Sequence, residues 1–147
     1  SNSVWCKCFY WLWTVYGNCS GGIIMNKKVI DTEIEIAYNA ILNRIANEKG
    51  QVQKTFRGQI TSFGASIIMG SLLSAIAFFS DSEKSSVNRK LLLQAIYDIL
   101  KEQGKISPDE KDLFEYAKAH GKEGKEEIIN AAIALKLAMN LFELIGE

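Results

Sequence analysis

The residues of this sequence whose types and spacing best suit a chemical task are basic. Arg44, Lys49, Lys54 and Arg57 fall within fourteen residues, and only Glu48 opposes them there. A guanidinium holds two phosphate oxygens at once, and an ammonium neutralises a phosphate as a point charge. This spacing therefore favours contact with a polyanion. The alternative is ordinary solubilising surface charge.

Catalytic groups do not occur in productive patterns. His120 is the single histidine, which excludes a multi-histidine metal centre, and the carboxylates of Glu33 and Glu35 or Glu126 and Glu127 are spaced so that they do not share a helix face. The sequence has no nucleophile elbow and no phosphate-cradling glycine loop. We expect a protein that is not an enzyme, with no catalytic residue, no metal and no cofactor.

Composition indicates one domain with an uneven distribution of charge. The 147 residues are 48% hydrophobic, with 17 basic and 17 acidic side chains, which is enough apolar material for a substantial core. Residues 25–60 hold six basic and four acidic groups, whereas residues 107–127 hold four basic and seven acidic ones. We therefore expect a basic region early in the domain and an acidic region late in it.

The first 24 residues differ from the rest of the chain. We interpret Ser1-Asn2 as the remnant of an expression tag and residues 3–24 as translated from an upstream start codon, so that Met25 begins the natural domain, residues 25–147. A metal site is not expected because a fourth ligand is missing, and the cysteine-free remainder fits a reducing cytoplasm. The extension contains every cysteine and tryptophan: Cys6, Cys8 and Cys19, and Trp5, Trp11 and Trp13.

A long uncharged run occupies residues 58–79, where small residues alternate with large apolar ones. Helices approach closely where side chains are short, so we predict that residues 64–79 form the central helix of the domain. A membrane span is the rival interpretation, because a span needs about 20 residues. Five serines between Ser62 and Ser80 favour the buried helix, and we expect no membrane contact.

The other periodic segments predict further helices with short connections. Ser107, Pro108 and Glu110 are typical of a capped helix start, and Gly104 and Gly121 are expected to end helices. The sequence therefore predicts an all-α fold, a compact bundle of about six helices around the small-residue-rich central helix. The expected segments are residues 31–48, a shorter one from Val52 to Phe63, and residues 64–79, 87–103, 107–120 and 123–145.

The order of short motifs across residues 25–147 is that of a known family. An early helix with Ala37-Tyr38 is followed by a basic linker, by an apolar segment with Phe63-Gly64 and Ala77-Phe78, by a leucine-rich helix ending near Tyr97, and by a long apolar last helix. In this order the chain resembles the small α-helical subunit family of the type III-B CRISPR Cmr effector complex. It has Arg57-Gly58-Gln59 where members often carry a proline.

The resemblance implies a non-catalytic, cytoplasmic subunit in antiviral defence, associated with other Cmr subunits. Copies of such a subunit stack in a minor filament and contact guide and target RNA. Stacking through unlike surfaces need not close, so it propagates along a filament. We expect the acidic residues Asp109, Glu110 and Asp112 to lie in the subunit contact. The residues expected to neutralise RNA phosphates are Arg44, Lys54, Arg57, Arg89 and Lys90.

Two other classes of function remain as alternatives. One is a stand-alone helical adaptor whose apolar last helix forms a homo-oligomer without any nucleic-acid role. The other is a small-molecule sensor with a pocket near Gly64 and Gly70. A helix-turn-helix across residues 59–75 is disfavoured because its second helix has no side chain that reads bases.

Overall fold

A computed structural model of the chain describes residues 27–81 and 87–146. They form a predominantly helical domain, which confirms the expected class, with five helices rather than about six and one short strand pair. The expectations about residues 1–24, their cysteines included, lie outside the described residues. In chain order the elements are α2 (Lys27–Arg44), β1 (Gln51–Gln53), α3 (Lys54–Met69), α4 (Leu72–Phe79), α5 (Lys90–Glu102), α6 (Leu113–Met139) and β2 (Glu143–Ile145).

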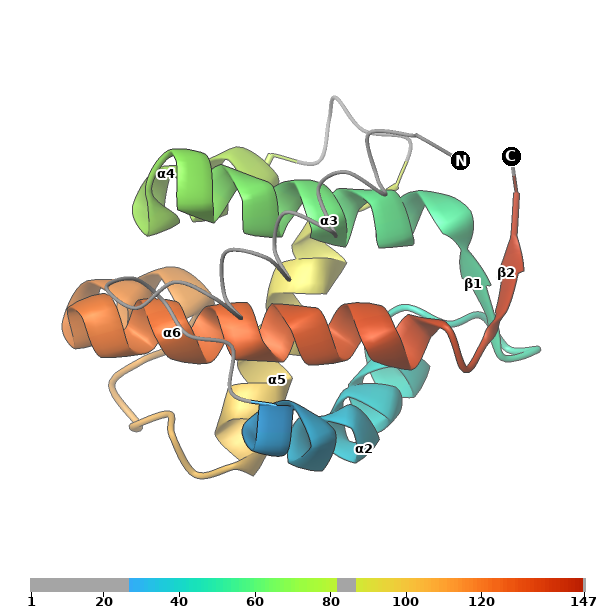
Figure 1. Ribbon diagram of the computed structural model, residues 1–147, viewed down its shortest axis with the longest axis horizontal. Coiled ribbons are helices and arrows are strands. Elements are labelled where there is room, and N and C mark those ends of the chain that lie inside the picture. Colours follow the sequence, from blue (N-terminus) through green and yellow to red (C-terminus); the bar gives the residue numbers. More distant parts are fainter. Residues whose placement is uncertain (1–26, 82–86, 147) are drawn as a thin grey trace.

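The centre of the fold is α6 and not the small-residue segment that the sequence suggested. It contacts each of the other four described helices, with α3 and α4 on one side, α2 on the other, and α5 crossing behind it (Figure 1). The reason lies in its composition, because residues 128–136 are buried without interruption, the polar Asn130 and Lys136 among them. A helix that is apolar on nearly all sides must be enclosed by its neighbours.

The uncharged run is split into two helices at Gly70, and not at Gly64 as the sequence suggested. α3 continues through Gly64, which is buried against α6, and ends at Met69. At Gly70 a Cβ atom would lie 3.0 Å from the carbonyl oxygen of Ser66, so the break suits glycine. Ser71 then caps α4 by accepting a hydrogen bond of 3.2 Å from the Ser74 N–H. None of the helices in the described ranges has the length and hydropathy to cross a bilayer.

The last helix also ends earlier than expected. α6 stops at Met139, and Glu143–Ile145 pair in parallel with Gln51–Gln53 at one end of the molecule (Figure 1). Nearby, the Tyr38 ring of α2 stacks on Phe142 with centroids 4.6 Å apart. A strand pair thus lies at this end of the molecule, where the sequence predicted that the last helix would continue.

The start of α6 differs from the expected capping box. Asp112 caps it by accepting a hydrogen bond of 2.8 Å from the Glu115 N–H, while the Ser107 N–H donates to the Glu110 carboxylate in the preceding loop. The helix holds one non-helical residue, Gly121, with φ of 54°. This is where the sequence predicted a boundary between two helices. Gly104, with φ of 72°, follows the end of α5 as expected.

Two glycines give a matched test of this geometry. We expect Gly121→Ala to destabilise the domain by about 1–3 kcal/mol, because an L side chain is strained at positive φ. Gly58→Ala, in the interior of α3 with open space around its Cβ position, should stabilise it by about 0.5–1 kcal/mol. Urea unfolding of both variants measures the two effects. Equal shifts for the two variants would contradict a kink at Gly121.

Candidate nucleic-acid interface

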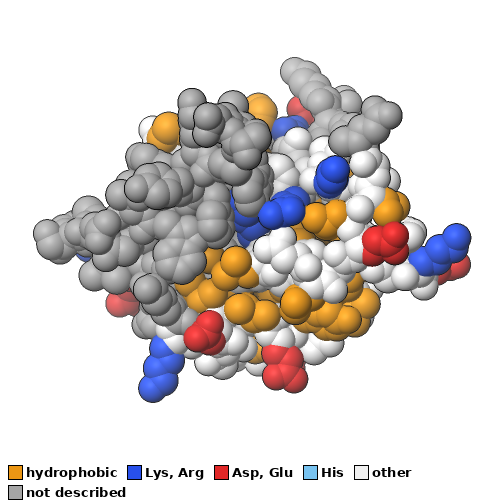
Figure 2. Space-filling model, turned by 45° about the vertical axis from the view of Figure 1, so that its right-hand side comes forward, with side chains coloured by type: hydrophobic (Ala, Val, Ile, Leu, Met, Phe, Trp, Pro, Cys, Tyr) orange, Lys and Arg blue, Asp and Glu red, His pale blue; other side chains and the backbone are white. Residues whose placement is uncertain are grey.

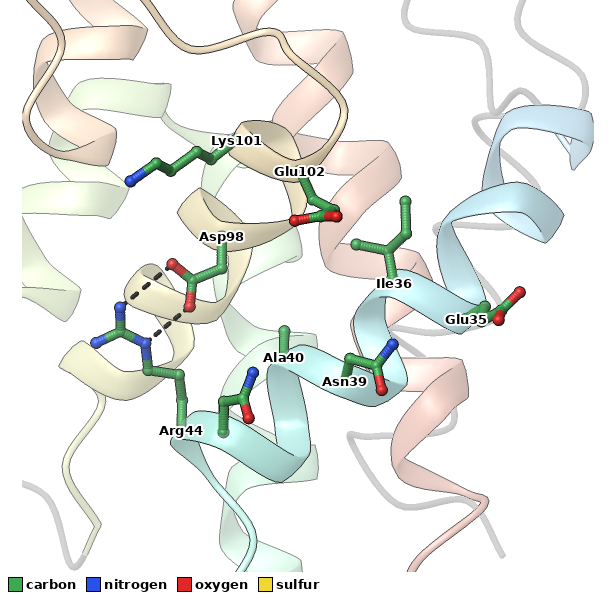
Figure 3. A pocket seen from close by; sticks show the side chains of 9 residues that line it. Glu35, Ile36, Asn39, Ala40, Arg44, Asp98, Lys101 and Glu102 are labelled. Carbon is green, nitrogen blue, oxygen red and sulfur yellow. Dashed lines mark hydrogen bonds and ion pairs between the residues drawn. The ribbon is translucent and has the colours of Figure 1, made fainter. Parts of the chain in front are cut away.

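The predicted site residue Arg44 lies at the end of a polar groove between α2 and α5. Its guanidinium makes two hydrogen bonds to Asp98, of 2.7 and 3.2 Å, and these bonds raise the pKa of Arg44 (Figure 3). The groove has a volume of about 960 Å³ and also contains Glu35, Lys101 and Glu102. With three carboxylates against two cations, this groove by itself does not favour a phosphate chain.

Arg44 and Lys90 are brought together at a second hollow, which we call the Lys111 hollow. It has a volume of about 310 Å³. Lys90 and Lys111 are exposed, and among the described residues that line this hollow Asp112 is the one carboxylate. Its walls come from the end of α4, the start of α5 and the first turn of α6. The lining residues are Arg44, Ile76, Ser80, Lys90, Leu93, Gln94, Tyr97, Lys111, Asp112, Leu113 and Phe114.

A third hollow, the Lys122 hollow, contains lysines that the sequence interpretation missed. It has a volume of about 620 Å³ and lies between the α3–α4 junction and α6. Its lining residues are Gly70, Ser71, Leu72, Leu73, Ala117, Lys118, Gly121, Lys122 and Lys125. The spacing i, i+4, i+7 of the lysines was the available signal, since a regular helix places such side chains on one face, although in the structure the kink at Gly121 separates Lys118 from Lys122 and Lys125. The net negative charge of residues 107–127 led the sequence interpretation to overlook these lysines.

Two of the other predicted RNA-binding residues lie at the start of α3. Lys54 is exposed and Arg57 is half-buried, one turn apart. The Arg57 carbonyl accepts a hydrogen bond of 3.0 Å from the Thr61 hydroxyl. The structure therefore groups Lys54 with Arg57, and Arg44 with Lys90.

Arg89 has a different environment from its neighbour Lys90. It is 5% exposed, and its guanidinium donates to the carbonyl oxygens of Phe78 and Asp81. Its Cζ atom lies 4.7 Å from the Phe78 ring centroid and 5.2 Å from that of Phe79. These contacts join the end of α4 to the start of α5.

The three acidic residues expected in a subunit contact also differ from one another. Asp109 is exposed, whereas Glu110 is 6% exposed and its carboxylate lies 2.6 Å from His120 Nε2. The hydrogen bond from the Ser107 N–H lowers the pKa of Glu110. Asp112 is exposed but caps α6. Asp109 is thus the member of this set most open to a partner.

The region around Gly64 offers no room for a metabolite. The cavity there has a volume of about 10 Å³, which is no more than a single water molecule needs. Lys136 of α6 lines it, is 3% exposed and donates a hydrogen bond of 2.5 Å to the Thr61 hydroxyl. The Gly64 side of the pocket expected for a small-molecule sensor is therefore filled by α6, whereas Gly70 lines the Lys122 hollow of about 620 Å³.

Glu33 is the most perturbed carboxyl group among those described. It is fully buried on α2, and burial raises its pKa to about 7, with Glu127 adding to the effect and Lys105 opposing it. Lys105 itself pairs with Glu127. An interaction with the Gln103 side chain also opposes the rise. Burial of a carboxyl group in this way favours its neutral form.

An apolar surface lies at the end of the molecule that carries the strand pair. With that end turned forward, hydrophobic side chains gather on the lower part of the face, between scattered acidic and basic ones (Figure 2). Leu42 is 45% exposed and Leu141 is 64% exposed. On α3 and α4, Met69 and Phe78 are 75% and 62% exposed. Single exposed apolar residues are common on protein surfaces, whereas a gathered patch such as the one in Figure 2 is typical of a contact surface.

This protein is a small helical domain that is built around one enclosed helix. Lysine side chains line two hollows on its surface. The family model described as CRISPR-associated protein (Cas_Cmr5) matches residues 31–138, well over half of the chain. The chain therefore belongs to the Cas_Cmr5 family, which confirms the resemblance, and it is a small CRISPR-associated Cmr subunit. No curated protein and no solved structure matches the chain significantly.

The contrast between Arg89 and Lys90 is testable by stability. Arg89→Ala should lower the free energy of unfolding by about 2–4 kcal/mol, because two carbonyl groups lose a buried charged donor and two rings lose a cation. Lys90→Ala, at an exposed neighbouring position, should change it by less than about 0.5 kcal/mol. Chemical denaturation measures both. Similar effects of the two substitutions would contradict the buried placement of Arg89.

The buried carboxyl group predicts a specific pH dependence. Because the pKa of Glu33 is raised in the folded state, from 4.5 to about 7, its stabilising neutral form is fully present below pH 4.5 and is lost as the pH rises through 7. Glu33→Gln should therefore gain stability relative to the parent between these values, by up to about 3 kcal/mol.

The control for this measurement is Glu35→Gln, at an exposed position two residues along the same helix. Thermal unfolding at pH 5 and pH 8 of the parent and both variants gives the comparison. A Glu33→Gln variant with the same pH profile as the parent would show that this carboxyl group does not titrate with folding.

Proposed function

We propose that this chain is a non-catalytic structural subunit of a type III-B CRISPR Cmr effector complex, acting in the cytoplasm in antiviral defence. The observation that carries the proposal is the family match over residues 31–138. A helical domain of this size serves such a complex by contacting other subunits and RNA, without transforming a substrate.

The roles of the charged groups support a non-catalytic function. Asp98 pairs with Arg44, Asp112 caps α6, and Glu110 accepts a hydrogen bond from the Ser107 N–H. Arg89 joins two helices. Each of these charged groups is thus held by a contact within the fold, and a group held in this way is poorly suited to act as a general acid or base on a substrate.

For RNA contact we propose Lys54, Arg57, Arg44 and Lys90, each neutralising a phosphate without reading a base. Lys54 and Lys90 are exposed, and Arg44 keeps 40% of its side chain exposed beside Asp98. Arg89 is left out of this proposal because its guanidinium is buried between two helices.

For self-stacking in a filament we propose contact through exposed apolar side chains in different parts of the fold. Leu42 and Leu141 are exposed near the strand pair, and Met69 and Phe78 are exposed on α3 and α4. A contact between different surfaces of successive copies does not close on itself. Asp109, in the exposed loop before α6, is the acidic residue that we retain for this contact.

The alternative of a stand-alone adaptor that dimerises through its last helix has less support. The apolar residues of α6 are covered by α2, α3, α4 and α5 of the same chain, so the helix offers no free apolar stripe to a second copy. The apolar character of α6 is explained by its central place within one domain and does not require a second copy.

The proposal is tested in the assembled complex. Co-expressed with the other Cmr subunits, the chain should co-purify with them in fixed proportion, and Lys54→Glu with Arg57→Glu should weaken target-RNA binding by about tenfold. Lys28→Glu with Lys49→Glu, at exposed positions, is the control with equal charge. A chain that does not co-purify would overturn the subunit role, and unaltered RNA affinity would overturn this placement of the contact.

A further inference from the structure

Two of the hollows described above share the same two helices. α4 lines the Lys122 hollow with Leu72 and Leu73 and the Lys111 hollow with Ile76, one turn further on. α6 lines them in the opposite order, with Phe114 in the Lys111 hollow and Lys118 in the Lys122 hollow. The hollows are therefore neighbours along one antiparallel helix pair.

Lys118 connects the two hollows directly. Its Nζ atom lies 5.2 Å from the centroid of the Phe114 ring, so a residue of one hollow covers a residue of the other. α6 is kinked at Gly121, and a Cβ atom at Gly124 would lie 3.8 Å from the carbonyl oxygen of Tyr116, so the two parts of the helix come close together there. Lys118, Lys122 and Lys125 therefore gather around one hollow at this kink, next to the hollow that contains Lys90 and Lys111.

The charge along this path is almost entirely positive. Five lysines line the two hollows, and we call them the lysine track: Lys90, Lys111, Lys118, Lys122 and Lys125. Among the described residues lining them, Asp112 is the single carboxylate, and its oxygen accepts the capping hydrogen bond of α6. Lys118 makes the one ion pair of the track with a described residue, to Glu115 at 3.2 Å.

Several acidic residues of the same sequence region are absent from the described lining of the Lys122 hollow. Glu123, Glu126 and Glu127 lie close to the track lysines in sequence but do not line this hollow. Glu127 pairs instead with Lys105 of the loop before α6. The described lining of the two hollows is thus mainly cationic, with Asp112 and the partner of Lys118, Glu115, as the acidic exceptions, and such a surface attracts a polyanion.

The lining between the lysines favours a single strand over a duplex. Phe114 and Tyr97 place aromatic rings in the Lys111 hollow, and Leu72 and Leu73 form an apolar wall in the other. Single-stranded nucleic acid combines phosphate contacts with bases that pack on aromatic and apolar side chains, whereas paired bases cannot reach such a wall.

We propose that a segment of single-stranded RNA runs along the groove between α4 and the first half of α6, its phosphates neutralised by the lysine track. This inference rests on the proposed function, and it names a path for the RNA that extends from Lys90 toward Lys125. The contact is independent of base sequence, because lysines neutralise phosphates without reading base edges.

The test uses the full chain, alone and in the assembled complex, with an unstructured polyuridine strand as probe. Lys118→Glu with Lys122→Glu and Lys125→Glu should weaken binding by about tenfold or more. Replacing the same three lysines by alanine should reduce the slope of log affinity against log salt by about 2, since each phosphate contact on a single strand contributes about 0.7. The corresponding arginine variant should bind as the parent does. Circular dichroism verifies that each variant is folded.

The matched control is Lys28→Glu with Lys49→Glu and Lys101→Glu, three exposed lysines outside the track, which change the net charge equally. Equal losses for the two glutamate variants would overturn the track, because the effect would then be one of overall charge. Equal affinity of the parent for a blunt RNA duplex would overturn the single-strand assignment. Co-purification with the other subunits is scored separately, so a track that fails while assembly persists leaves the proposed function standing.

Discussion

The structure depends on the need to enclose α6. From residue 128 to residue 136 this helix has no exposed face, so it is stable only with apolar side chains packed on every side. Ala131, Ala132, Ala134 and Ala138 keep its surface shallow, which permits close approach of the surrounding helices. The four other described helices take their places from this requirement, two on one side, one on the other, and one behind (Figure 1).

Enclosure of α6 also explains the polar groups found inside the domain. Lys136 is buried because it belongs to the enclosed helix. Its ammonium group donates a hydrogen bond to the Thr61 hydroxyl of α3. Arg89 is buried where α5 leaves α4, and its guanidinium satisfies two backbone carbonyls there. Hydrogen bonds of this kind offset part of the cost of burying a charge, although the Nε atom of Arg89 has no partner among the described residues. These residues therefore fix the positions of neighbouring elements and are not available to a ligand.

The first half of α6, in contrast, is only partly enclosed, and its exposed side contributes Lys118 to the Lys122 hollow. Before Gly121 the helix packs one face on the core, with Tyr116 and Ala117 buried, and leaves Lys118 exposed beside α4. Gly121 interrupts the regular geometry just where the lysine-lined hollow opens. The second half of α6 thus forms the core of the domain, and its first half forms part of the wall of a lysine-lined hollow.

The sequence by itself determined the helical class, the end of α5 at Gly104, the interruption at Gly121 and the Cas_Cmr5 family, because these depend on local periodicity, on glycine geometry and on motif order. Tertiary structure alone decided the rest. Gly64 serves close packing rather than a break, and the residues of β2 leave the helix to pair with β1, a partner more than ninety residues away. The lysines of residues 111–125 lie within residues 107–127, a stretch with net negative charge, and only the tertiary structure shows that they line two hollows beside α4. Local patterns record which residues are near in the chain, whereas burial and charge segregation depend on which helices meet.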